Sequence, residues 1–179
     1  MKNRSRIIIY GNSILLITFT IYFFVLPTVI LIQALGDPGL RSGETPGYAF
    51  RWHQSLSERI EEWALNRVAS GQAAQMDTYD ISGTEWPIFS SVFYLWTTEA
   101  LQDAWEEDPS LAKSMPSQYA RGAIEAVTAL IADPNHAAWV KKHWGEDYLE
   151  SENLFYRMLL ISGLALVSLI WGLRGWQKP

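Results

Sequence analysis

The chain has no cysteine and only three histidines among its 179 residues. The absence of cysteine excludes disulfide bonds, thiolate nucleophiles and cysteine-based metal sites. A domain without thiols is also indifferent to the redox compartment, so either side of a membrane suits it. The sequence has no glycine-rich nucleotide-binding loop, no serine nucleophile elbow and no HExxH zinc motif. We therefore expect neither a cofactor nor a metal ion.

Positive charge is also scarce, and the formal net charge is -5. Nucleic-acid binding requires a basic surface, so nucleic acid is not expected as a partner. All 19 acidic residues lie between positions 37 and 152, where only eight basic residues offset them and leave a net charge of -11. The remaining basic residues lie near the two ends of the chain: Lys2, Arg4, Arg6, Arg157, Arg174 and Lys178.

Residues 7–35 carry no charge. A helix of about 20 apolar residues crosses the hydrocarbon core of a bilayer, which is about 30 Å thick. The alternative is a cleaved signal peptide, whose apolar core spans about 7–15 residues and precedes a small-x-small cleavage site. This run is much longer and no clear A-x-A motif follows it, so we predict an uncleaved transmembrane helix. Pro27 is expected to kink or end this helix late in the span.

The basic tip, residues 1–6, is expected to remain in the cytoplasm by the positive-inside rule. The acidic middle of the chain would then lie outside, in the periplasm or the extracellular space. We predict an integral membrane protein that lies in the bacterial inner membrane.

The middle of the chain is predicted to be all-α. Residues 36–48 are rich in glycine and proline and predict a linker, and residues 49–153 predict an extracytoplasmic helical domain. Apolar residues at helical spacing indicate four helices, and no segment shows the two-residue alternation that is typical of strands. The first has a stripe of Leu56, Ile60, Trp63, Ala64 and Val68. The second begins near Thr84, its N-cap, with Pro87 in its first turn. The third begins near its N-cap Ser117, and the fourth begins at Asn135 and ends at Gly145. The third has a buried stripe of Ala120, Ala123, Ile124, Val127, Leu130 and Ile131.

Residues 154–173 form a second apolar segment with one charge, Arg157, near its start. As a helix it would be about 30 Å long, with Arg157 reaching to the interface and Trp171 and Trp176 marking the other one. We predict a second transmembrane helix followed by a cytoplasmic tail, residues 174–179. The alternative is a helix buried in the domain itself.

Few residues suggest chemistry. His136 and His143 would share a helix face near Glu146 and Asp147, but a solvated helix end is the favoured interpretation. Isolated His53 is expected on the surface. The acidic run Asp103, Glu106, Glu107 and Asp108 predicts a solvated face rather than a metal site.

Glu85 is the one candidate catalytic residue, because it opens an apolar helix beside Trp86. A carboxyl group held against apolar walls can act as a general acid. The alternative is a charged residue favoured by the positive end of the helix dipole.

From Glu85 onward, short motifs follow one another in a characteristic order. They are Phe93-Tyr94, Ala100-Leu101, Asp108-Pro109-Ser110-Leu111, Tyr119-Ala120-Arg121-Gly122, Trp139, Trp144-Gly145-Glu146-Asp147 and Glu152-Asn153-Leu154-Phe155-Tyr156-Arg157. This order resembles the N-terminal part of linalool dehydratase-isomerase-like proteins. The resemblance implies part of an (α/α)6 toroid that performs acid–base chemistry on alkenols, with Glu85 near the early catalytic acid.

The chain departs from that family at the other chemical positions. Leu159 and Leu160 stand where the resemblance implies a histidine, and the family's active-site cysteines are absent. The resemblance therefore implies a shortened relative that keeps the helical scaffold without its chemistry, and it also favours the buried-helix alternative for residues 154–173.

Two functions remain. The leading prediction is a non-catalytic, tryptophan-rich, membrane-anchored helical module that is an accessory or structural subunit. Its partners would be the lipid bilayer and another membrane protein or a second copy of the chain. The alternative is a membrane-tethered relative of the lyases that acts on a hydrophobic substrate, with Glu85 as the acid and Tyr94 or Tyr156 nearby.

Overall fold

The computed structural model describes residues 2–150 and 154–171, and within these ranges the secondary structure is helical with no strand. This confirms the all-α prediction. The chain divides into two compact units, residues 1–48 and residues 49–179. The predicted tail, residues 174–179, lies outside the described residues, as do residue 1, residues 151–153 and the end of the second apolar segment, residues 172 and 173.

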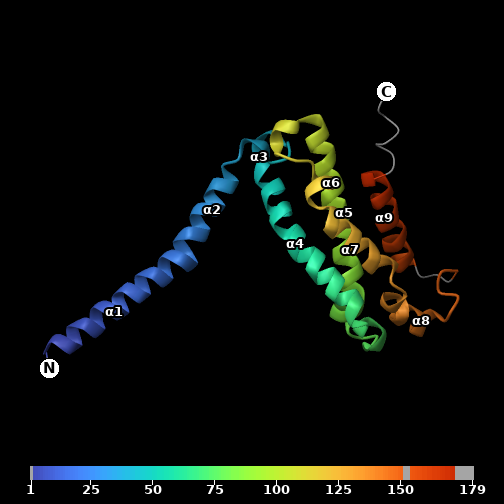
Figure 1. The fold of residues 1–179 in the computed structure, drawn as a ribbon, viewed down its shortest axis with the longest axis horizontal. Coiled ribbons are helices and arrows are strands. Elements are labelled where there is room, and N and C mark those ends of the chain that lie inside the picture. Colours follow the sequence, from blue (N-terminus) through green and yellow to red (C-terminus); the bar gives the residue numbers. More distant parts are fainter. Residues whose placement is uncertain (1, 151–153, 172–179) are drawn as a thin grey trace. The chain divides into compact units, whose positions relative to one another are not determined.

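The helices follow one another along the chain as labelled in Figure 1. The first unit contains α1 (Lys2–Thr20), a π-helical segment (Ile21–Val25), α2 (Leu26–Leu35) and α3 (Pro38–Ser42). The second contains α4 (Gly47–Ser70), α5 (Ile81–Glu107), α6 (Pro116–Tyr119), α7 (Arg121–Ala132), α8 (Ala138–Trp144) and α9 (Leu154–Trp171). Short 3₁₀ segments lie at Gln72–Gln75, Pro109–Leu111 and Pro134–Ala137. The predicted linker thus contains a short helix, α3.

Pro27 neither ends the first apolar helix nor leaves it undisturbed. The helix continues through Pro27 to Leu35, but a π-helical turn, Ile21–Val25, directly precedes the proline. A proline ring collides with the carbonyl group four residues earlier and cannot donate to it, and a widened turn relieves that conflict. The hydroxyl groups of Thr20 and Thr28 donate to the carbonyl oxygens of Leu16 and Phe24. The backbone irregularity and these hydroxyl groups are therefore accommodated inside the helix.

Two helical segments are long and apolar enough to cross a membrane, judged by length and composition. They are Tyr10–Leu35, whose described side chains are exposed except for that of Ala34, and Leu154–Trp171, of which about a quarter is buried. The two differ in packing. The C-terminal segment, α9, contacts both α5 and α7 within the second unit.

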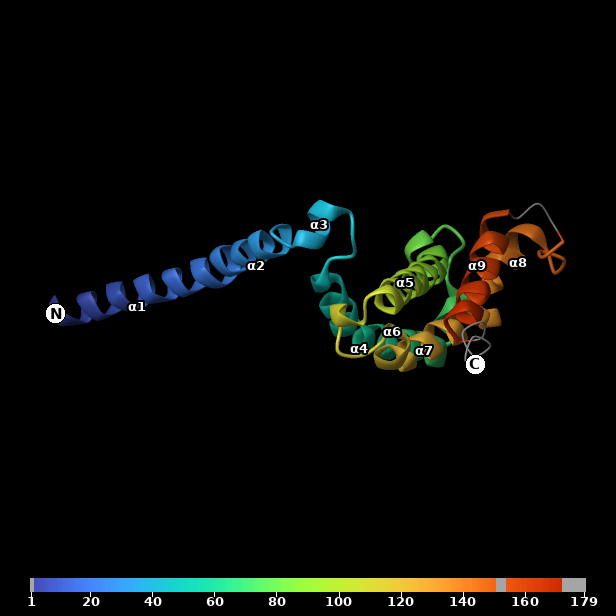
Figure 2. The ribbon, with the colours of Figure 1, turned by 90° about the horizontal axis from the view of Figure 1, so that it is seen from above.

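The core of the second unit lies where α5, α7 and α9 meet. Figure 2 shows α5 lying over a layer that includes α4 and α7, with α9 beside α8 at one end. The predicted stripe of α7 is confirmed, because each of its six apolar residues is at most 1% exposed. On α9 the buried positions are Tyr156, Leu159, Gly163, Leu166 and Ile170. A Cβ atom at Gly163 would lie 2.9 Å from Ile131 Cδ1, so a larger residue at this position would require the Ile131 side chain to shift.

Three sequence-based details are wrong. On α4 the predicted stripe is right for buried Ala64 and for Ile60, Trp63 and Val68, which pack against the core, but Leu56 is exposed. The buried face of α4 also includes Phe50, His53 and Ser57. Helix α5 begins at Ile81 with Asp80 as its cap, so Thr84 lies inside the helix and donates to the Asp80 carbonyl. Ser117 does not cap α6; its backbone N–H donates instead to the side chain of Gln102.

Because α5 starts early, Pro87 lies in its interior and leaves the Gly83 carbonyl without its helical donor. The guanidinium group of Arg67, on α4, donates to this carbonyl oxygen. An α4 side chain thus replaces the hydrogen bond that proline removes, and ties α4 to the first turns of α5.

Removing the Arg67 side chain is expected to lower the free energy of unfolding by about 1–3 kcal/mol, the cost of an unpaired buried acceptor. In a Pro87→Ala background the alanine N–H can supply the missing bond, so Arg67→Ala should cost measurably less. Denaturant titration of the four proteins of this double-mutant cycle gives the coupling energy. Equal costs in both backgrounds would show that Arg67 does not serve the Gly83 carbonyl.

Candidate functional site

An aromatic surface covers the exposed side of α5. It consists of Trp86, Phe89, Phe93 and Trp96 of α5 together with Phe155 of α9. Neighbouring rings along α5 lie 6.1, 4.4 and 4.9 Å apart between centroids, and Phe155 stacks on Phe89 at 6.2 Å. The α5 members recur every three or four residues, which places them on one helix face. Trp86 is 58% exposed and Phe93 42%, so the surface faces away from the core.

Glu85 lies at the edge of this surface. Together with Trp86, Phe89 and Phe155 it lines a hollow of about 180 Å³. The side chain is half-buried, and the rest of the lining is apolar. Tyr94 and Tyr156, expected near Glu85, are not among the lining residues. The arrangement therefore has one carboxyl group beside a hydrophobic patch.

A second polar group of residues, centred on His53, lies in the interior. His53 was predicted on the surface, but it is 4% exposed. Its Nδ1 lies 2.9 Å from the Tyr119 hydroxyl and its Nε2 lies 2.9 Å from Thr98 Oγ1. The ring also stacks on Tyr94 with 4.9 Å between centroids. The surface prediction failed because these partners lie 45 and 66 residues away along the chain.

The hydrogen bonds around His53 form a closed circuit that joins α4 to α5 and α6. Thr98 donates to the Tyr94 carbonyl oxygen, so its own oxygen accepts from His53 Nε2–H, and Nδ1 accepts from Tyr119. The Tyr94 hydroxyl donates to Ser57, which donates to the His53 carbonyl oxygen. Each hydroxyl proton is used once. The circuit is saturated with neutral histidine, as a structural network requires.

Burial lowers the pKa of His53 from 6.5 to about 4. An unfolded chain binds a proton at this residue as the pH falls through about 6.5, whereas the folded chain resists it until about pH 4. Stability from His53 is therefore present above pH 6.5 and lost progressively down to pH 4. Between pH 7 and pH 5 the loss amounts to about 2 kcal/mol.

His53→Gln is expected to flatten this dependence, because glutamine keeps a donor and an acceptor and does not titrate. Unfolding followed by circular dichroism in mild detergent at pH 4–7 measures the slope. Exposed His143 provides the matched control, and His143→Gln should leave the slope unchanged. An unchanged slope in His53→Gln would contradict the assignment.

His136 is also buried, at 1% exposure, rather than solvated as predicted. Its Nδ1 lies 3.0 Å from an oxygen of Asp133, and burial lowers its pKa. The predicted pairing with His143 fails because Pro134–Ala137 form a 3₁₀ turn rather than the first turn of one continuous helix. His143 is exposed, and Glu146 pairs with Lys141 at 3.1 Å.

The acidic run at the end of α5 is exposed throughout, which confirms the prediction of a solvated face. Within the described part of the chain, no group of three or more histidine, aspartate or glutamate side chains is placed to hold a metal ion.

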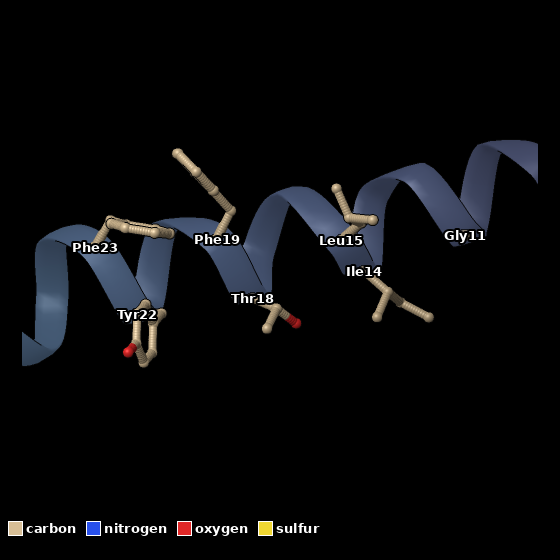
Figure 3. A pocket seen from close by; sticks show the side chains of 7 residues that line it. All are labelled: Gly11, Ile14, Leu15, Thr18, Phe19, Tyr22 and Phe23. Atoms are coloured by element: carbon tan, nitrogen blue, oxygen red, sulfur yellow. The ribbon is translucent and has the colours of Figure 1, made fainter.

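The N-terminal helix has a shallow apolar hollow of its own, of about 570 Å³. Figure 3 shows Leu15, Phe19 and Phe23 on one side of this helix and Ile14, Thr18 and Tyr22 on the other. Gly11 contributes no side chain and widens the hollow at one end. The lining is almost entirely hydrocarbon, as a lipid-facing or helix-packing surface requires.

No protein-family model, curated protein or solved structure matches this chain. The resemblance to linalool dehydratase-isomerase-like proteins therefore stays a prediction. Glu85 likewise stays a candidate whose geometry is known and whose role is a hypothesis. Three features of the molecule bear on its function: an exposed apolar N-terminal helix, an aromatic surface and a hydrogen-bonded network around buried His53.

Proposed function

We propose that this chain is a non-catalytic, membrane-anchored helical module that serves as an accessory subunit of a membrane protein complex. Residues 7–35 anchor it with the N-terminus in the cytoplasm, and the acidic helical domain lies on the periplasmic or extracellular side of the bacterial inner membrane. The positive-inside rule supports this orientation, because Lys2, Arg4 and Arg6 precede the span.

The observation that carries the non-catalytic part of the proposal is the closed circuit around His53. A general base needs a lone pair free to accept a substrate proton. In the circuit His53 Nδ1 already accepts from Tyr119, and its Nε2–H is donated to Thr98. The most deeply buried titratable group on α4 thus joins α4 to α5 and α6, which is the role of a scaffold. High tryptophan content and the exposed aromatic surface support binding through large apolar contacts.

The test is to extract the full chain from its native membrane with a polymer that keeps the surrounding lipid, and to weigh the particle. The proposal predicts one fixed ratio to a partner membrane protein, or a homo-oligomer of defined size. The ratio should survive a change to mild detergent. A lone monomer in both media would contradict the proposal.

The hollow at Glu85 favours a second candidate, a lyase or hydratase that acts on a hydrophobic alkenol. Glu85 would donate a proton to the leaving hydroxyl group while the aromatic rings hold the hydrocarbon. This candidate predicts turnover of linalool by the membrane-embedded protein and loss of that turnover in Glu85→Gln. Exposed Glu58, on α4, is the matched control, since Glu58→Gln should retain it. Absence of turnover in the unmodified protein would rule this candidate out for that substrate.

A further inference from the structure

The outer faces of α5 and α9 both carry exposed apolar side chains, which the proposed function does not explain by itself. From this surface we infer that the helical domain lies on the bilayer, with α5 and α9 in the plane of the membrane and their outer faces in its interfacial layer. The inference rests on the membrane anchoring proposed above and deepens it, because it names lipid as the ligand of the aromatic surface.

The first support is that α9 is apolar on both sides from Met158 onward, after its one charged residue, exposed Arg157. A helix at the surface of a soluble domain is polar on its outer face, whereas a helix apolar all round is buried or in contact with lipid. From Met158 to Trp171 the helix carries no charge. Its exposed apolar positions are Leu154, Phe155, Met158, Ile161, Leu164, Ala165, Leu169 and Trp171.

The second support is that α5 continues this surface with a charge-free stretch of similar length. Between Glu85 and Glu99 no residue is charged, which corresponds to about 20 Å of helix. The stretch carries the aromatic surface, with a tryptophan near each end. Because α5 and α9 pack against each other, the two apolar faces adjoin. Tryptophan concentrates at the level of the lipid head groups, where an apolar ring with one polar atom is favoured.

The third support is that two hydroxyl groups on this surface, those of Thr97 and Ser168, donate within their own helices. Thr97 of α5 donates to the Phe93 carbonyl oxygen at 2.9 Å, and Ser168 of α9 donates to that of Leu164 at 3.0 Å. A protein partner with polar groups would compete for such donors, whereas lipid hydrocarbon offers them nothing. In the N-terminal helix the hydroxyl group of Thr20 likewise donates to a carbonyl oxygen of its own helix, that of Leu16.

The packing of α9 explains why α5 and α9 would lie in the plane of the membrane instead of crossing it. The inner face of α9 is occupied by the domain core, and Gly163 lies against Ile131 and Val92. Hydrogen bonds join α5 to α4, whose exposed residues include Glu58 and Arg59. A spanning arrangement would carry these charges into hydrocarbon at high cost. An in-plane arrangement buries only the outer faces, as amphipathic membrane-surface helices do.

The absence of cysteine makes the experiment direct, because one introduced cysteine gives one spin label. Phe93→Cys and Ile161→Cys place the label on the outer faces of α5 and α9. Leu65→Cys is the matched control: Leu65 is also a large apolar side chain, 52% exposed, but it lies on α4 between exposed Glu62 and Asn66. Each labelled full-length chain is reconstituted into phosphatidylcholine vesicles. Its collision rates with oxygen, which enters lipid, and with a water-soluble nickel chelate are then compared.

The inference predicts an oxygen-to-nickel ratio several-fold higher at positions 93 and 161 than at position 65. Equal, water-like ratios at all three positions would overturn it, because the face would then lie in water. Protection of positions 93 and 161 from both reagents would also overturn it, since a protein partner or a second copy would cover the face. Failure of the unmodified protein to float with the vesicles would instead contradict the anchoring on which the inference rests.

Discussion

Replacing Leu95 with aspartate is expected to unfold the helical domain. Leu95 is 0% exposed and lies in the core formed by α5, α7 and α9. Loss of its side chain alone costs about 2–5 kcal/mol, and burial of an unpaired carboxyl group adds several more. The sum is comparable with the 5–15 kcal/mol that stabilises an ordinary domain. The measurement is the near-ultraviolet circular dichroism and the protease resistance of the variant in mild detergent.

Exposed Leu56 on α4 supplies the control for this substitution. Leu56 is 50% exposed, so Leu56→Asp should change the free energy of unfolding by no more than about 0.5 kcal/mol. The sequence pattern alone assigns Leu56 to the buried stripe, and the structure assigns it to the surface. Comparable damage from both substitutions would contradict the packing described here.

Two arginines in the N-terminal helix are expected to prevent its insertion. Leu16→Arg and Phe23→Arg each place a charge near the middle of the span, at a cost of about 3 kcal/mol per charge on translocon scales. The combined penalty of about 6 kcal/mol is comparable with the whole gain from the 17 Ile, Leu, Phe and Val residues between positions 7 and 32, about 5–10 kcal/mol at roughly 0.3–0.6 kcal/mol each. Glycosylation mapping of the segment in a reporter protein measures the inserted fraction, which should fall from nearly complete to minor.

The matched control is the pair Leu16→Ala and Phe23→Ala, which removes the same side chains without adding charge. Many other apolar residues remain in the segment, so insertion should persist. Unchanged insertion of the double-arginine segment would show that residues 7–35 do not cross the bilayer as a helix of lipid-exposed side chains.

The sequence was sufficient to predict the helical class and the apolar N-terminal helix, because both depend on local properties. A long uncharged run specifies a lipid-compatible helix whatever surrounds it. The α7 stripe was likewise predictable, since six apolar residues at helical spacing have only one face to bury. Glu85 lies beside an apolar patch because it directly precedes Trp86 on the same helix, but α5 begins at Ile81, so Glu85 does not open the helix as predicted.

The polar interior could not be predicted as easily. His53 stands among charged residues in sequence, and its partners Thr98 and Tyr119 belong to other helices. A usable signal existed, because Phe50, His53, Ser57 and Ala64 recur at intervals of three, four and seven residues. Only the assumption that a buried stripe must be apolar excluded it. The start of α5 is difficult to predict for a different reason: Pro87 is typical of a first helical turn and indicates a start near Thr84, whereas the cap is Asp80.

The second apolar segment shows where composition stops being decisive. Residues 154–171 satisfy the length and composition of a membrane span, yet Leu159, Leu166 and Ile170 pack into the domain core. Hydropathy cannot separate a core helix from a span, because both exclude water. The partners of each helix face can separate them, and α9 has the core on one face and the apolar outer surface on the other.

The most direct test of membrane anchoring uses the unmodified full-length chain. Cells that produce it are broken without detergent, the membranes are collected by high-speed centrifugation, and the pellet is washed with alkaline carbonate to strip peripheral proteins. An anchor over residues 7–35 predicts that the chain stays in the pellet through the wash and leaves it only with detergent. Recovery of the chain in the first supernatant would contradict the account.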